Sequence, residues 1–250
     1  MTFITCLLEF LLTLDAIHSI QSSSNKEDAC VYSPPELELD LTSSLYDRIA
    51  DELVENGYLI LPSALPESLL QDLYQHVRAQ DDDAFHRAGI GRDQDHQLHG
   101  RIRRDQIRWL NRQHPAETAY LDWMEGLREG LNRRLFMGLF DYEAHFAHYP
   151  AGAFYARHLD AFRGQTNRVL TTVLYLNPQW DETQGGELLI WPEPDSDATI
   201  ATVVPRMGTL VIFLSERFPH EVLPAKTDRF SIAGWFRVNA SINNQLDPPR

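Results

Sequence analysis

The sequence predicts a β-rich α+β protein, a double-stranded β-helix (jelly roll) buttressed by N-terminal and central helices. Up to about residue 136, apolar residues recur every three or four positions, which is typical of amphipathic helices. After residue 141 the period becomes two, in short segments separated by Gly, Pro, Asn and Asp. With 250 residues, 43% of them hydrophobic, the chain can also bury a substantial core.

Three segments of the first half are predicted to be helices. "LTSSLYDRIADELVENG" carries Leu45, Ile49 and Leu53 on one stripe and stops at Gly57. A short strand, "YLILPSALP", leads to the second helix, "PESLLQDLYQHVRAQ", which opens at a proline. The third is "ETAYLDWMEGLREGLNRRLF", and the polar, glycine-containing residues 81–101 before it are predicted to form a mobile loop.

The second half is predicted to contain eight short strands, the number found in a double-sheet jelly roll. They are "YEAHFAHYP", "FYARHLD", "RVLTTVLYLN", "GELLIWP", "ATIATVVP", "GTLVIFLS", "HEVLPA" and "RFSIAGWFRV". We therefore expect one domain over residues 42–240, preceded by a poorly ordered or non-core extension (1–41) and followed by a tail (241–250).

Charge and cysteine content narrow the class of protein. The net charge of −14 argues against nucleic-acid binding, which requires clustered Lys and Arg. The apolar first twenty residues are interrupted by Glu9 and Asp15, so no membrane span is expected. Only Cys6 and Cys30 occur, which predicts no disulfide framework and fits a cytoplasmic location.

A candidate metal site begins in "AFYARHLD". If this stretch is a strand, His158 and Asp160 point to the same face. A third ligand could be His220 in "ERFPHEVLPA", on a later strand. Two histidines and one carboxylate with open positions are typical of non-haem Fe(II) oxygenases, although zinc with water fits the same ligands. A core histidine beside a turn aspartate is the alternative.

A candidate anion site lies nine residues after His220. Alternation in "DRFSIAGWF" places Arg229, Ser231 and Ala233 on one face, where the small residues leave room beside a guanidinium. A buried arginine needs a partner, and its planar fork suits a carboxylate. The partner is either an ordinary aspartate or the distal carboxylate of 2-oxoglutarate. Tyr175 could add a hydroxyl group, or simply pack in the core.

Several of these segments resemble one family. "HLD", "RVLTTVLYLNPQWDETQGGELLIWPE" and "FLSERFPHEVLPAKTDRFSIAGWF" are similar to the 2-oxoglutarate- and Fe(II)-dependent prolyl 4-hydroxylases of the hypoxia-sensing type and their bacterial relatives. The likeness runs from about Ile102 to Val238. Collagen-type relatives use lysine where this chain has Arg229, which favours the oxygen-sensing branch.

The resemblance implies roles for individual residues. The iron ligands would be His158, Asp160 and His220. The co-substrate would be bound by Arg229 and Tyr175 at its distal carboxylate and by Tyr149 near its metal-chelating end. Tyr155 and Asp105 match positions around the iron ligands, with a packed tyrosine and a surface acid as the alternative. His145 and His148 match no ligand and are expected to be structural.

The implied reaction is hydroxylation of a prolyl residue in a protein substrate, with 2-oxoglutarate converted to succinate and CO₂. Its cofactors would be Fe(II), 2-oxoglutarate and O₂, with ascorbate as reductant. Residues 87–101 correspond to a substrate-covering loop but show no likeness in sequence, so the substrate protein is not implied. Two alternatives stay open, a zinc hydrolase using the same three ligands and a catalytically silent jelly-roll binding module.

Overall fold

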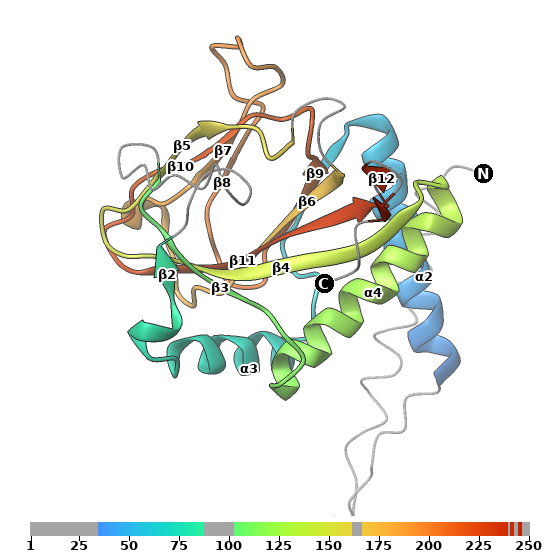
Figure 1. The fold of residues 1–250 in the computed structure, drawn as a ribbon, viewed down its shortest axis with the longest axis horizontal. Helices are drawn as coiled ribbons and strands as arrows, with labels where there is room; N and C mark the ends of the chain where they lie inside the picture. The colour runs from blue at the N-terminus through green and yellow to red at the C-terminus, as the bar shows by residue number, and fades with distance from the viewer. Residues whose placement is uncertain (1–34, 88–102, 162–166, 240, 243–244, 247–250) are drawn as a thin grey trace, which may run out of the picture. The chain divides into compact units, whose positions relative to one another are not determined.

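A computed structural model describes residues 35–87, 103–161, 167–239, 241–242 and 245–246 (Figure 1). The chain divides into two compact units, Met1–Leu39 and Asp40–Arg250, and the architecture below is that of the second. Most of the predicted extension and tail, and residues 88–101 of the predicted loop, lie outside the described residues. The predicted domain bounds therefore remain a prediction.

Seven antiparallel strands form the larger sheet, in the order β1-β9-β6-β11-β4-β3-β2. The long strands β4 and β11 cross its middle (Figure 1). The strands are β1 (Tyr58–Leu61), β2 (His86–Arg87), β3 (Gln106–Trp109), β4 (Leu139–Tyr149), β6 (Arg168–Tyr175), β9 (Leu210–Leu214) and β11 (Arg229–Val238). β2 and β3 were not predicted, because they are short strands in and just after the segment predicted as a loop.

Four antiparallel strands form the smaller sheet, in the order β5-β10-β7-β8. They are β5 (Tyr155–His158), β7 (Leu188–Ile190), β8 (Ala201–Val203) and β10 (His220–Val222). A separate hairpin pairs β12 (Ser241–Ile242) with β13 (Gln245–Leu246). Every one of the eight predicted strands occurs, as β4 to β11, and the two antiparallel sheets confirm the predicted jelly roll.

Helices cover one face of the larger sheet. They are α2 (Pro35–Glu55), α3 (Glu67–Arg78) and α4 (Pro115–Leu135), with short 3₁₀ turns η1 (Asp82–Ala84) and η3 (Glu182–Gln184). Leu73, Met124 and Leu127 pack with Phe146 and Ile232 of the sheet in one apolar core, and α4 lies along β4 (Figure 1). The predicted buttressing of one sheet by helices is thus observed.

A second apolar core lies between the two sheets. It contains Tyr149, Val173 and Tyr175 from the larger sheet and Ile190 and Val222 from the smaller one. Residues of the larger sheet therefore alternate between the helix side and the inner side, as expected for strands. Phe230 and Ile232 belong to the helix-side core. The alternation in the sequence predicted that they lie on the face opposite Arg229, but not that this face meets the helices.

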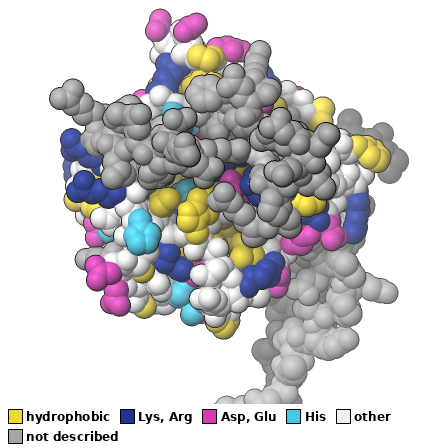
Figure 2. Space-filling view, in the orientation of Figure 1, with side chains coloured by type: hydrophobic (Ala, Val, Ile, Leu, Met, Phe, Trp, Pro, Cys, Tyr) yellow, Lys and Arg dark blue, Asp and Glu magenta, His cyan; other side chains and the backbone are white. Residues whose placement is uncertain are grey.

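The described residues show no segregation of charge on the face seen in Figure 2. There, the Lys and Arg side chains of the described residues are interspersed with Asp and Glu side chains. Within the described part of the chain, no helix has both the length and the apolar character needed to cross a membrane.

Candidate active site

Two histidines and one carboxylate converge where the two sheets face each other. His158 is the last residue of β5 and His220 the first of β10, and the two are direct partners in the antiparallel pair. Asp160 lies 3.6 Å from His158 (Oδ1 to Nε2) and 3.5 Å from His220 (Oδ2 to Nε2). All three ligand atoms are within 4.8 Å of one another, the only such cluster found in the described residues. A single metal ion could contact all three.

The backbone sets the orientation of both imidazoles. His158 Nδ1 lies 2.8 Å from the carbonyl oxygen of Ala156, and His220 Nδ1 lies 3.1 Å from that of Phe218. A carbonyl oxygen only accepts, so each Nδ1 carries the proton and donates it. Each Nε2 is then free of a proton in the neutral ring and presents its lone pair towards Asp160, as metal ligation requires.

The ionisation states also suit a metal ion. Burial by itself would raise the pKa of Asp160, but the neighbouring His220, His158 and Arg168 hold it well below its usual range. Burial lowers the pKa of His220 to about 4, with a further contribution from His158. At neutral pH the site therefore offers a carboxylate and a neutral imidazole, the forms that bind metal ions.

The sequence placed Asp160 on the strand with His158, and this detail was wrong. β5 ends at His158, and Asp160 follows in a bend. Its carboxylate is held instead by Thr171 on β6, whose hydroxyl donates to Oδ2 at 2.8 Å. Thr171 Oγ1 is also 2.9 Å from Ser215 Oγ. Thr171 was missed, although the alternation that puts Tyr175 on the inner face puts Thr171 there too.

Arg229 lies buried on the inner face of β11, and part of its guanidinium has no partner among the described residues. Nε donates to the carbonyl of Gly186 at 2.9 Å, and Nη1 is 3.4 Å from Ser231 Oγ. Nη2 is buried and has no hydrogen-bond partner among the described residues. Because no described carboxylate bonds to this group, the structure does not support the alternative of an ordinary Arg–Asp pair.

Two tyrosines flank this guanidinium. The rings of Tyr149 and Tyr175 each have their centroid 4.9 Å from the carbon at the centre of the Arg229 guanidinium. Burial raises the pKa of Tyr175 to about 12, although Arg229 acts in the opposite direction, so the hydroxyl stays protonated. This hydroxyl is also buried without a partner in the described structure. Two unused donors thus meet in one buried place, which suits a carboxylate.

Glycine allows the close approach of Arg229 to the neighbouring loop. Gly186 has a φ of +75°, and a Cβ there would lie 3.2 Å from Arg229 Cδ and 2.9 Å from Ala225 Cβ. A side chain at this position would be strained and would press on the arginine.

A stack of side chains connects Asp105 with the histidine pair. Tyr155 lies flat against His158, with ring centroids 3.5 Å apart, and the Arg103 guanidinium is 4.6 Å from the Tyr155 ring. Asp105 is 1% exposed and accepts hydrogen bonds from Arg103 Nε and Nη2, at 2.6 and 2.8 Å. Asp105 is therefore a buried acid, and it is linked to His158 through Arg103 and Tyr155. The part played by Arg103 was not predicted.

Comparison with known proteins identifies the family. Residues 144–237 match the 2OG-Fe(II) oxygenase superfamily. Prolyl hydroxylase EGLN3 of Mus musculus is 30% identical over 217 residues, covering 80% of this chain and 86% of the relative. The chain belongs to the 2OG-Fe(II) oxygenase superfamily. This confirms the resemblance seen in the sequence and, with it, Fe(II), 2-oxoglutarate and O₂ as the cofactors.

Two solved structures similar to this oxygenase are named prolyl hydroxylases. A prolyl-4-hydroxylase of Pseudomonas putida is 38% identical with a TM-score of 0.70, over 78% of this chain and 100% of that one. The prolyl hydroxylase of Trichoplax adhaerens, in complex with a hypoxia inducible factor peptide, is 26% identical with a TM-score of 0.71 (82% and 94%). Egl nine homolog 1 of Mus musculus is 32% identical over 73% of this chain. The oxygenase spans about half the length of Egl nine homolog 1, covering 47% of it.

β4 carries two histidines, His145 and His148, which lie on opposite faces of the oxygenase's larger sheet. His148 is on the helix side, stacked on Phe230 at 4.6 Å, as expected of a structural residue. His145 is on the inner side, in edge contact with Trp109 at 5.1 Å.

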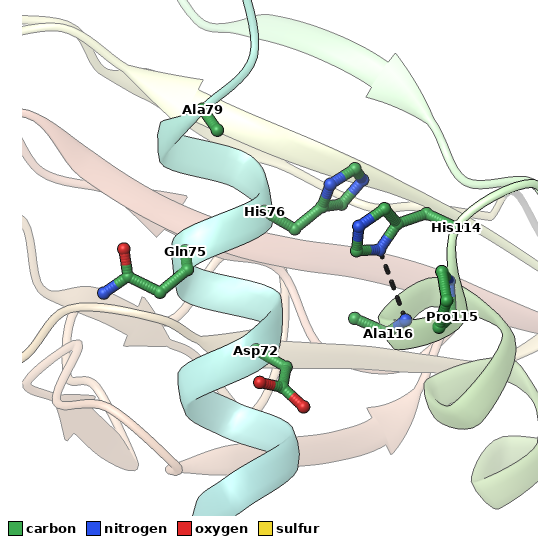
Figure 3. A pocket seen from close by; sticks show the side chains of 7 residues that line it. All are labelled: Asp72, Gln75, His76, Ala79, His114, Pro115 and Ala116. Atoms are coloured by element: carbon green, nitrogen blue, oxygen red, sulfur yellow. Dashed lines mark hydrogen bonds between the residues drawn. The ribbon is translucent and has the colours of Figure 1, made fainter.

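A hollow between α3 and the start of α4 contains none of the predicted site residues (Figure 3). Its lining comprises Asp72, Gln75, His76, Ala79, His114, Pro115 and Ala116. His76 and His114 stack at 3.6 Å, and His114 accepts from the backbone N–H of Ala116, which caps α4. His76 Nε2 is 2.7 Å from Glu117. These contacts are those of a helix junction of the oxygenase.

Proposed function

We propose that the protein is a 2-oxoglutarate- and O₂-dependent Fe(II) dioxygenase that hydroxylates a prolyl residue in a protein substrate, releasing succinate and CO₂. The observation that carries this proposal is the pair of donors without partners in the described structure, Arg229 Nη2 and the Tyr175 hydroxyl, which are buried on the inner face of the larger sheet. This face is opposite the smaller sheet, whose strands β5 and β10 carry the histidine pair. A zinc hydrolase would leave these donors unexplained.

The donor set fits Fe(II), since two imidazole nitrogens and one carboxylate leave open coordination positions. In the proposal, His158, Asp160 and His220 hold the metal ion, and Arg229 and Tyr175 hold the distal carboxylate of 2-oxoglutarate. Tyr149, beside the guanidinium, would line the co-substrate site near its chelating end.

Iron, when bound together with 2-oxoglutarate and O₂, supplies the oxidising power for the reaction, and the protein supplies orientation. The carbonyls of Ala156 and Phe218 keep both Nε2 lone pairs directed at the metal position. Tyr155 covers the ring of His158, and the Arg103–Asp105 pair holds Tyr155 in place. Tyr155 and Asp105 would therefore act by positioning a ligand rather than by contacting the substrate.

A prolyl residue in a protein is the substrate class that the relatives support, because three of those described above are named prolyl hydroxylases and one of these was solved with a peptide. Oxygen sensing, a cytoplasmic location, ascorbate as reductant, and the absence of nucleic-acid and membrane partners remain predictions from the sequence.

Two measurements test the function. The purified protein with Fe(II), 2-oxoglutarate and ascorbate should form succinate in an O₂-dependent way. Mass spectrometry of lysate proteins incubated with it should show proline residues that gain one oxygen atom, which protein without iron does not produce. Lack of both activities in folded, iron-loaded protein would favour the silent binding module. Succinate formation with oxidation of another residue type would reject only the prolyl assignment.

The proposed role of Asp160 predicts a specific effect of Thr171→Val. Valine has the shape of threonine but cannot donate to Asp160 Oδ2, so the carboxylate loses its anchor. We expect metal affinity to fall about 10- to 100-fold, the usual effect of removing a partner of a metal ligand. Metal titration of the apo protein measures this.

Thr172→Val is the matched control for this change. Thr172 is equally buried, but its hydroxyl bonds to Tyr142 on the helix side, 2.7 Å away. This variant should lose stability without losing metal affinity. Equal metal affinity in both variants would show that Thr171 does not orient Asp160.

A further inference from the structure

His145 is a buried polar residue that the roles assigned so far do not use. It is 2% exposed, and along β4 it shares the inner face with Ala147 and Tyr149. Neither Nδ1 nor Nε2 has a hydrogen-bond partner in the part of the chain that the structure describes. A buried imidazole normally has at least one such partner, because an unpaired buried donor costs about 1–3 kcal/mol.

The register of the larger sheet places His145 between the two halves of the site. Trp235 pairs with Thr171, the anchor of Asp160. Ala233 is the next inner-face residue along β11, and its partner on β4 is His145. Arg229 lies two inner-face positions further along β11. Because inner-face residues are about 7 Å apart along a strand, His145 is level with the space between the anchored carboxylate and the guanidinium.

The surroundings of His145 determine what it can bind. Trp109 and Trp235 contact its ring at centroid distances of 5.1 and 5.3 Å, and its strand partner Ala233 has only a methyl group. Burial lowers the pKa of His145 well below its usual value, and the nearby Arg103 and Arg168 act in the same direction. The ring is therefore neutral, with one N–H to donate and one lone pair.

Building on the proposed function, we propose that His145 is a co-substrate-binding residue whose ring N–H donates a hydrogen bond to an oxygen atom at the metal-chelating end of 2-oxoglutarate. Arg229 and Tyr175 would hold the other end. This arrangement uses a buried donor that otherwise has no partner in the described structure, and it adds a hydrogen bond at the chelating end, which Tyr149 would also line.

Binding of two ligands to the protein loaded with Mn(II) under anaerobic conditions tests this assignment without catalysis. The ligands are 2-oxoglutarate, and oxalate, which presents a chelating end but no distal carboxylate. We expect His145→Leu to weaken both about 10- to 100-fold, the range for a buried hydrogen bond to a charged group. Arg229→Gln should weaken 2-oxoglutarate alone. Calorimetric titration measures each affinity.

Three further variants separate binding from structure. His145→Asn and His145→Gln keep an N–H within reach, and at least one should recover part of the lost affinity. His148→Leu removes the other histidine of β4, on the helix side, and should leave both affinities unchanged. In the absence of ligand, His145→Leu should not lower the melting temperature, because it removes a polar group that has no partner there.

The inference is overturned if His145→Leu binds both ligands within about twofold of the wild type, well below the effect of losing such a hydrogen bond. If that variant does not fold, ring-nitrogen NMR of the wild-type protein loaded with zinc decides the question. The His145 N–H resonance should shift when oxalate binds, and an unchanged resonance would also overturn the inference. Failure of the wild type to bind 2-oxoglutarate would instead reject the proposed function.

Discussion

Asp160→Ala should reduce iron-dependent decarboxylation of 2-oxoglutarate to background and abolish tight metal binding. The carboxylate is the only anionic member of the cluster and lies about equally far from the two imidazole nitrogens, at 3.6 and 3.5 Å. Removing this carboxylate should therefore lower metal affinity by more than the roughly 10- to 100-fold that is typical when a residue contacting a metal ligand is removed. His220→Ala should have the same effect. Succinate formation and metal titration measure the two quantities.

Asp228→Ala is the control for this prediction. Asp228 is 3.6 Å from His148, away from the cluster, and its side chain is 49% exposed. This variant should keep wild-type activity and metal content. Substantial activity in Asp160→Ala would contradict the assigned ligand set, and full turnover with zinc as the sole metal would contradict the iron assignment alone.

Arg229→Gln should weaken binding of 2-oxoglutarate while leaving metal affinity intact. Arg229 is 1% exposed, and its guanidinium bonds to the Gly186 carbonyl at 2.9 Å and weakly to Ser231 Oγ at 3.4 Å. Neither is a charged group, so a bound carboxylate would be its charged partner. Loss of a buried charged contact should cost about 2–5 kcal/mol, or roughly 30- to 5,000-fold in affinity. Anaerobic titration of the metal-loaded protein measures the change.

Arg237→Gln provides a matched comparison on the same strand and face. Arg237 is 3% exposed, but unlike Arg229 it is paired, with Nε 2.9 Å from Asp141 Oδ1. Breaking this pair leaves a carboxylate without its charge partner, so we expect a lower melting temperature and unchanged affinity for 2-oxoglutarate. If the two variants had the same 2-oxoglutarate affinity, Arg229 would not be the carboxylate anchor.

Several structural features follow from the sequence because they depend on neighbouring residues alone. A period of two in "RFSIAGWFRV" assigns Arg229 to one face of β11 and Phe230 to the other, whatever the rest of the fold does. Gly57 is likewise a local signal, and α2 ends just before it, at Glu55. The ligand types of the metal cluster were also recognisable from motifs in the sequence.

Partners far apart in the chain were not predictable in this way. Thr171 meets Asp160, Gly186 meets Arg229, and Arg103 joins Asp105 to Tyr155 only because separate strands come together in the folded sheets. The sequence by itself thus determined the fold class, the faces of the strands and the residue types of the site. Only the tertiary structure decided which donors at Arg229, Tyr175 and His145 have no partner within the described residues, because hydrogen-bond satisfaction depends on contacts through space and not on order along the chain.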